Sequence, residues 1–181
     1  MRKLSKGSES AVSKKIELMI KIIIRTDSYL NSANTKSTIL LSLSSALIAA
    51  FAINFDKIIS LVNLSSDKEV LSFLIVMALI LLIASMIFSL GGIKPYIGGS
   101  TLPNSFSFVD INNYYKEFPD YQKNFSTVRG TVFLNELLAL NHNLSLALVA
   151  KYKKQLKAIL FLEMAAYILC FAIIIITLAN I

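Results

Sequence analysis

Three stretches of the chain are long, strongly apolar and almost free of charge. They cover residues 37–55, 70–93 and 158–181, and only Glu163 interrupts the last one. Each is close to or above the ~20 residues that a helix needs to cross ~30 Å of hydrocarbon. Hydrophobic residues make up 55% of the sequence and charged residues 16%, below the roughly 25% charge of soluble domains. The sequence therefore predicts three transmembrane helices.

The connections between these stretches alternate in charge. Residues 1–36 and 94–157 each carry eight Lys and Arg, whereas residues 56–69 carry two Lys against three acids. Basic loops stay on the cytoplasmic side, so the N-terminus is expected inside and the C-terminus outside. The predicted order is a cytoplasmic helix (1–36), two membrane helices with a short outer loop (37–93), a cytoplasmic loop and helix (94–157) and a third membrane helix (158–181).

The predicted cytoplasmic parts also have helical periodicity. Apolar residues before the first span recur at intervals of three and four, and so do the residues before the third span. The first series is Val12, Ile16, Met19, Ile23, Asp27 and Leu30, in which Asp27 is a polar interruption, and the second is Leu134, Leu137, Asn141, Leu144, Leu148, Lys151 and Gln155. No Pro or Gly lies between Ser8 and Lys57, or after Gly130. We expect an all-α membrane protein whose first and third membrane helices continue as long cytoplasmic helices and form a stalk.

Two further expectations concern packing. The first span is rich in Ser and Ala, which let membrane helices approach closely, so it is expected to be the packing core, with the second span facing lipid. The stretch 98–130 holds two prolines and seven aromatic residues from Phe106 to Phe125. The stretch 98–130 is expected to fold onto the stalk and to contain a short helix near residues 108–118.

Catalytic chemistry has no recognisable signature in this sequence. A single Cys and a single His exclude a disulfide framework and a multi-histidine metal site within one chain. No phosphate-binding glycine loop, paired metal ligands or nucleophile elbow occurs. We expect no enzymatic activity, no cofactor and no metal. The net charge of +7 could attract nucleic acid, anionic lipid or an anionic ligand, but membrane orientation accounts for most of it, and no nucleic-acid partner is expected.

Polar side chains concentrate where both stalk helices approach the membrane. The candidates for ligand binding on the first helix are Arg25, Asp27, Asn31, Asn34 and Lys36, and those on the second are Asn141, His142, Ser145, Lys151 and Tyr152. One interpretation is an interfacial collar, in which Lys36 and Arg25 reach lipid headgroups. The other is a polar pocket between the two helices that could hold the base edge and phosphate of a nucleotide.

Glu163 is the single acid within a predicted span. An ionisable group there is costly and usually has a partner inside the helix bundle. Lys36, at a similar depth on the first span, is one candidate partner. Alternatively, Glu163 is shallow enough to reach the headgroups by itself.

Several segments together resemble the membrane effector family of the Pycsar antiphage system. They are Asp27–Ser37 (DSYLNSANTKS) before a Ser- and Ala-rich span, Lys94-Pro95-Tyr96 after the second span, the element Ser105–Ile111, and Lys151-Tyr152 before the last span. The resemblance implies an effector in the bacterial inner membrane. It implies that a partner cyclase makes a cyclic nucleotide of the cyclic CMP or cyclic UMP type, which makes the effector impair membrane integrity. The chain lacks the β-roll type of cyclic-nucleotide domain, so a nucleotide would have to bind the helical stalk.

Other classes of function stay open at this point. The chain could be a small structural or assembly membrane protein without a ligand, a transporter or enzyme subunit, or a two-span effector of another nucleotide-second-messenger system. Three helices cannot enclose a water-filled pore, so disruption of a membrane requires several copies. We expect a homo-oligomer that uses the apolar surface at Leu18, Ile22 and Ile24, the small-residue face of the first span, or both.

Overall fold

The computed structural model describes residues 2–180, with side chains from residue 9 onward. All regular structure in this part of the chain is helical. The helices are α1 (Arg2–Ile53), α2 (Phe55–Ile59), α3 (Ser65–Ile93), α4 (Phe108–Tyr114), α5 (Phe118–Thr127) and α6 (Gly130–Leu178). The predicted fold class is confirmed: α1, α3 and α6 are long and apolar enough to cross a membrane.

The two long helices agree closely with the sequence prediction. α1 runs without interruption through the boundary predicted at residue 36, and α6 runs in the same way through the boundary predicted at residue 157, as expected from the absence of Pro and Gly after Gly130. α3 ends after Gly91 and Gly92, and Lys94 has extended backbone (φ −48°, ψ 135°). That conformation is expected because Pro95 disfavours helical geometry in the residue before it.

The chain divides into two compact units, which we call the head unit and the bundle unit. The head unit holds the first part of α1, up to Ser32, together with Pro95–Val149. The bundle unit holds Ala33–Lys94 and the part of α6 from Ala150 onward. Three covalent connections join the units: α1, the Lys94–Pro95 bond and α6.

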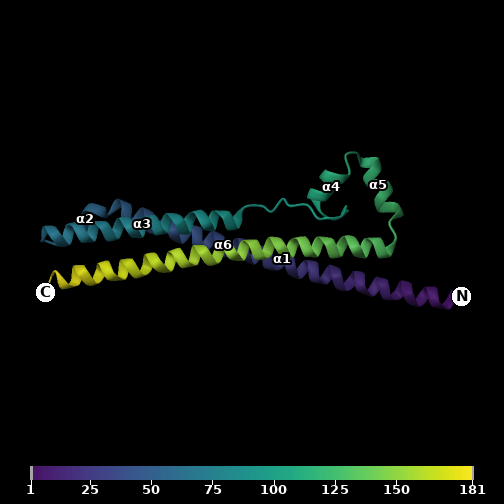
Figure 1. The fold of residues 1–181 in the computed structure, drawn as a ribbon, viewed down its shortest axis with the longest axis horizontal. Coiled ribbons are helices and arrows are strands. Elements are labelled where there is room, and N and C mark those ends of the chain that lie inside the picture. Colours follow the sequence, from purple (N-terminus) through teal and green to yellow (C-terminus); the bar gives the residue numbers. More distant parts are fainter. Residues whose placement is uncertain (1, 181) are drawn as a thin grey trace. The chain divides into compact units, whose positions relative to one another are not determined.

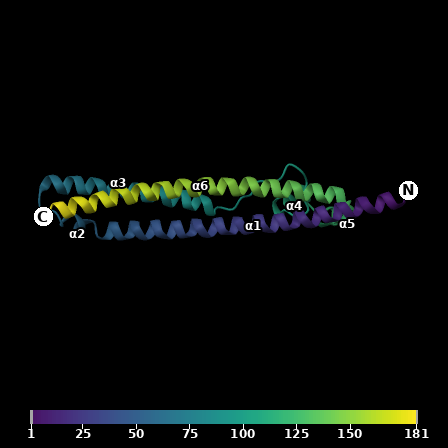
Figure 2. The same ribbon diagram turned by 90° about the horizontal axis from the view of Figure 1, so that it is seen from below.

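In the bundle unit, α3 packs along the later part of α6 (Figure 2). The buried residues of α3 are spaced four and three apart: Leu71, Ile75, Ala78, Leu82, Ser85, Ser89 and Gly92. Those of α6 include Ala158, Ala165 and Ala172, seven residues apart and at most 4% exposed. This repeat is typical of left-handed helix packing, and the alanines allow close approach.

The helices of the bundle unit are joined by hydroxyl groups at one level and by apolar side chains at another. The Ser44 and Ser85 hydroxyls lie 3.1 Å apart, and Ser85 donates a second hydrogen bond of 2.9 Å to the Ala158 carbonyl. Further along, Val62, Leu71, Ile75 and Ala172 form an apolar core, against which Phe51, Ile58 and Ile176 pack. α1 and α6 therefore run in the same direction through this unit.

The expected packing roles of the first two spans were wrong. In its most apolar stretch α3 is 28% buried, against 11% for α1 and for α6. In α1 the buried small residues of the span are Ser37 and Ser44, while Ser42, Ser45, Ala46 and Ala49 are exposed. Large residues on α3 fill the bundle because one face of α3 meets both other helices.

Gly92 provides a testable contact in the bundle unit. A Cβ atom at this position would lie 2.5 Å from Ser37 Oγ on α1, whereas a Cβ atom at Gly91 would meet only the flexible Lys154 side chain, at 3.3 Å. Both substitutions to Ala gain helix propensity, so their difference isolates the clash. We expect Gly92→Ala to be less stable than Gly91→Ala by about 1–3 kcal/mol, the usual cost of overpacking.

The measurement is thermal unfolding of the detergent-solubilised protein, followed by circular dichroism. Adding Ser37→Ala to Gly92→Ala removes the closest atom and should restore part of the loss. Equal unfolding midpoints for the two glycine variants would contradict the close approach of α1 and α3.

In the head unit, the segment before α4 packs against the first part of α6, and α4 and α5 continue the chain from it (Figure 1). The Asn104 side chain donates to the Glu136 carbonyl at 2.6 Å, and the Phe106 and Phe133 rings meet edge to face at 4.8 Å. α4 begins at Phe108, as predicted, but ends at Tyr114, and α5 was not predicted. The expectation that the aromatic stretch folds onto the stalk is confirmed.

Candidate functional site

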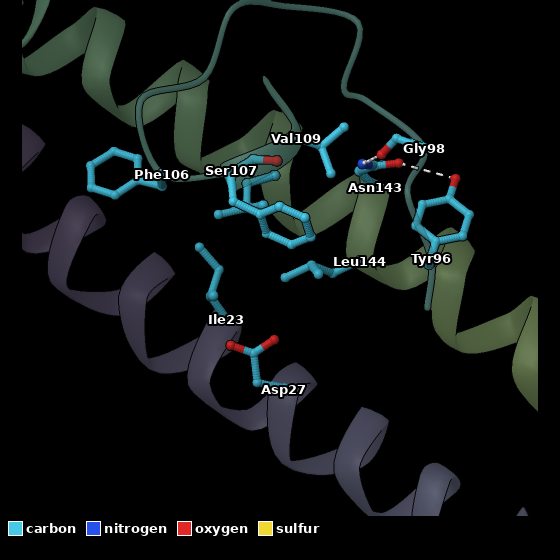
Figure 3. Close-up of a pocket in the computed structure, with 11 residues that line it drawn as sticks. Ile23, Asp27, Tyr96, Gly98, Phe106, Ser107, Val109, Asn143 and Leu144 are labelled. Atoms are coloured by element: carbon cyan, nitrogen blue, oxygen red, sulfur yellow. Dashed lines mark hydrogen bonds between the residues drawn. The ribbon is translucent and has the colours of Figure 1, made fainter. Parts of the chain in front are cut away.

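A cavity of about 240 Å³ lies in the head unit, between α1, α6 and the segment that leads into α4. Figure 3 shows Ile23 and Asp27 on one side and Asn143, Leu144 and Val109 on the other. Its lining residues are Ile23, Asp27, Tyr96, Gly98, Phe106, Ser107, Phe108, Val109, Leu140, Asn143 and Leu144. Aromatic and aliphatic side chains with a few polar groups are typical of small-molecule sites.

Asn143 fixes one wall of the cavity. Its amide donates to the Gly98 carbonyl at 2.7 Å, and its Oδ1 accepts from the Tyr96 hydroxyl at 3.2 Å (Figure 3). Asn143 is 9% exposed, so these hydrogen bonds are largely shielded from water and hold the backbone after Pro95 against α6. The wall is therefore preorganised rather than a loose loop.

Asp27 is the acidic group of the cavity, and Figure 3 shows its carboxylate directed toward the other lining residues. Partial burial raises the pKa of Asp27 above its ordinary value, because desolvation disfavours the charged form. One residue earlier, Thr26 donates to Asn141 Oδ1 at 3.3 Å and joins α1 to α6. Among the lining residues that the structure describes there is no Lys, Arg or His.

A second polar centre lies in the bundle unit around Lys151. The Lys151 ammonium is 8% exposed and donates three hydrogen bonds, to the Gly92 carbonyl (2.7 Å), Asn34 Oδ1 (2.9 Å) and the Lys94 carbonyl (3.0 Å). The last carbonyls of a helix have no partner within the helix and carry partial negative charge. Lys151 therefore caps the C-terminal end of α3.

The charge of Lys151 has only neutral acceptors around it. Burial lowers the pKa of Lys151, and the positive charge of Lys154 acts in the same direction. Gln155, one turn further along α6, donates to the Ala33 carbonyl and to Ser37 Oγ on α1. Lys151 and Gln155 thus tie α6 to both other helices of the bundle unit at one level.

The predicted binding residues are divided between the two units. Asp27 lines the cavity and Asn141 lies beside it in the α1–α6 contact, whereas Asn34 and Lys151 pair in the bundle unit. Arg25 is exposed and donates to the Tyr29 hydroxyl at 2.8 Å, and Ser145 donates to the carbonyl of Asn141. Asn31 and His142 are exposed in the head unit, and Lys36 is exposed and Tyr152 half-buried in the bundle unit. Their roles in ligand binding stay predictions.

The proposed pairing of Glu163 with Lys36 was wrong. Both residues are exposed, and the single ion pair among the described residues joins Glu17 to Lys21 at 2.6 Å. Glu163 lies on the opposite side of α6 from Ala158 and Ala165, which face the bundle. It therefore does not face the interior of its own bundle.

Sequence reasoning missed the residues that shape the cavity. Asn143, Tyr96, Gly98 and Phe106 line it, and none was a predicted site residue. The sequence did offer one signal, the cluster Asn141-His142-Asn143 on an otherwise apolar helix. A polar side chain of this cluster that is buried, as Asn143 is, needs hydrogen-bond partners from another segment.

The geometry and composition define a multi-pass α-helical membrane protein with a helical head unit. The family model of the Pycsar effector protein domain matches residues 18–179, so the chain belongs to the Pycsar effector family. It is a membrane effector of antiphage defence that belongs to a cyclase-linked system. The resemblance is thereby confirmed, and it takes precedence over the two-span alternative. Neither the curated proteins nor the solved structures contain a match to the chain.

Proposed function

We propose that the head unit binds a cyclic pyrimidine nucleotide and that the bundle unit then impairs the integrity of the bacterial inner membrane. The infected cell stops before phage release. The N-terminus is cytoplasmic and the C-terminus outside, which is supported by eight basic residues in each predicted inner segment. The effector acts without catalysing a reaction, in line with the lack of a catalytic motif in the sequence.

The cavity supports this proposal through its size and chemistry. A volume of about 240 Å³ lies just below the ~300 Å³ at which drug-sized ligand sites begin, which suits a pyrimidine base with its sugar and phosphate at the mouth. Phe106 and Phe108 offer aromatic faces for stacking. Asp27 can accept a hydrogen bond from the exocyclic amine of cytosine, whereas uracil presents an oxygen acceptor there. The ligand proposed is therefore cyclic CMP in preference to cyclic UMP.

The chain between the two units supports a route for the signal. Tyr96 and Gly98 form part of the cavity wall, and two residues before Tyr96 the Lys94 carbonyl accepts a hydrogen bond from Lys151. A ligand that moves the wall pulls on this short connection through the rigid Pro95. The expected output is a change in the cap of α3, which ties together the helices of the bundle unit.

We expect cyclic CMP to raise the unfolding midpoint of the detergent-solubilised protein more than cyclic UMP does. Asp27→Asn should remove this preference, because an amide can donate to the uracil oxygen as well as accept from the cytosine amine. A well-placed pair discriminates by ~1–3 kcal/mol, or about 5- to 150-fold in affinity. Affinity for cyclic CMP should also fall as the pH drops through the pKa of Asp27, because the protonated carboxyl has lost its charge and is a weaker acceptor. The titration is followed by thermal shift or calorimetry.

Asp120→Asn is the matched control, since Asp120 is exposed on α5 and does not line the cavity. It should keep the parent preference. Equal responses of the parent to both nucleotides would overturn the role of Asp27.

The membrane step is tested separately with dye-loaded proteoliposomes, in which cyclic CMP should release the dye. Leakage that is the same with and without nucleotide would contradict ligand activation.

A second candidate is an assembly protein without a ligand. The observation that favours it is the lack of a basic side chain among the described lining residues, since phosphate recognition usually uses Lys or Arg. For this candidate no cyclic nucleotide shifts the unfolding midpoint, and the Asp27→Asn variant behaves like its parent.

A further inference from the structure

Glu163 is an unpartnered acid on the outside of the bundle unit. It is exposed, and no hydrogen bond or ion pair joins it to another residue that the structure describes. It lies about one and a half turns into the third span. An ionisable residue at such a depth normally faces a partner rather than lipid. Since its own bundle supplies none, a partner has to come from outside the chain.

The same unit presents a complementary surface on α1. Ser42, Ala46 and Ala49 are spaced four and three apart and are all exposed. Small residues with this spacing allow another helix to approach closely within lipid. The Ser42 hydroxyl has no hydrogen bond within the part of the chain that the structure describes. It can both donate to and accept from a carboxyl group.

The two surfaces lie at the same level of the bundle unit. Ser37 meets Gln155, Ser44 and Ala158 are both bonded to Ser85, and Phe51 packs at the core around Ala172. These contacts place Glu163 between the levels of Ser44 and Phe51, within about one turn of Ser42. Copies related by rotation about the membrane normal keep their depth, so Glu163 of one copy can reach Ser42 of the next.

We propose that two copies of the chain associate through these surfaces, with Glu163 and Tyr167 on α6 of one copy inserted against Ser42, Ala46 and Ala49 on α1 of the next. Tyr167, one turn after Glu163, is 74% exposed and supplies a large side chain for the small-residue face. The contact joins two different surfaces, so each copy offers one of each, and the association closes into a ring if the rotation between copies is a whole fraction of a turn. The proposal rests on the membrane impairment proposed above, which requires several copies, and it names the contact of the homo-oligomer expected from the sequence.

The test is disulfide crosslinking in membranes. Two differently tagged chains, both carrying Cys170→Ser to remove the native thiol, are co-expressed, one with Ser42→Cys and the other with Glu163→Cys. Oxidation should give a crosslinked dimer that carries both tags. The control pairs Ser42→Cys with Thr177→Cys, an exposed position on α6 near its end, and should not crosslink.

Crosslinking between two Glu163→Cys chains in place of the mixed pair, or no crosslink at all, would overturn the contact. A second measurement uses Glu163→Gln and Glu163→Leu, because Gln keeps the hydrogen bond and Leu does not. Hydrogen bonds between membrane helices predict that Leu weakens self-association in detergent about 3- to 15-fold, with Gln close to the parent. Equal self-association of Glu163→Gln and Glu163→Leu would also overturn the contact. Crosslinking is measured with and without cyclic CMP. If the crosslink forms equally in both cases, the result counts against the proposed ligand and not against the contact.

Discussion

Replacing Lys151 by Met should destabilise the bundle unit by about 2–4 kcal/mol, more than any other single lysine replacement in the chain. The variant leaves the Gly92 and Lys94 carbonyls and the Asn34 side chain without the ammonium that they share. Each buried acceptor left unpaired costs about 1–3 kcal/mol, and relief of the buried charge offsets part of the sum. The chain has no Trp, so unfolding is followed by circular dichroism in detergent.

Lys154→Met is the matched control for this prediction. Lys154 also donates to a carbonyl of α3, that of Gly91, at 2.9 Å, but it does so in an exposed position, where water can replace it. Its loss should cost less than about 1 kcal/mol. If the two variants have the same unfolding midpoint, the Lys151 cap on α3 stabilises the protein no more than a surface contact does. In proteoliposomes Lys151→Met should also lose the response to nucleotide, because the connection from Tyr96 ends at this cap.

The second large effect is expected at Asn104 in the head unit. This side chain is completely buried; it donates to the Glu136 carbonyl at 2.6 Å and accepts from the amides of Phe106 and Ser107 at 2.8 and 3.2 Å. Asn104→Ala leaves the amides of Phe106 and Ser107 without their acceptor and removes one hydrogen bond from the Glu136 carbonyl, which should cost about 2–4 kcal/mol. The expected result is local opening of the segment before α4, and with it loss of the cavity wall formed by Phe106.

Hydrogen exchange resolves this opening. The amides of residues 105–110 should exchange much faster in Asn104→Ala than in the parent, while those of α3 should stay protected. Asn112→Ala is the control, because Asn112 is exposed on α4. Uniform acceleration along the whole chain would mean that the head and bundle units unfold as one cooperative unit, contrary to this prediction.

The sequence allowed the membrane helices and their extensions to be predicted because hydropathy and helical period are local properties. α1 and α6 have no internal Pro, and their apolar series keep the helical spacing across polar positions such as Asp27 and Asn141, so their bounds followed to within a few residues. The end of α3 could also be predicted, since Gly91, Gly92 and Pro95 all indicate the end of a helix. α5 was not predicted; its Pro119 lies in the first turn, where Pro is favoured, whereas Pro ends or kinks a helix elsewhere.

The candidate site was less predictable, for a physical reason. Its residues meet through partners far apart in sequence, such as Lys151 with Gly92 and Asn143 with Gly98. Lys151 carried a local signal, a charge on an apolar series, but nothing local indicated that it would cap another helix. For Glu163 the rule that intramembrane acids face the bundle predicted the wrong side, because the rule refers to the whole assembly and not to one copy.

The cap on α3 also fixes how long this helix can be. Lys151 occupies carbonyls that another helical turn would need, and Pro95 prevents that turn, so α3 stays at 29 residues. Its apolar stretch, residues 70–93, is about 36 Å long at 1.5 Å per residue. The hydrocarbon layer is only ~30 Å thick. The mismatch has to be met by tilting the helix or by thickening the bilayer around it. Where the bilayer thickens, each copy strains the surrounding lipid, and copies gathered in one place add their strains.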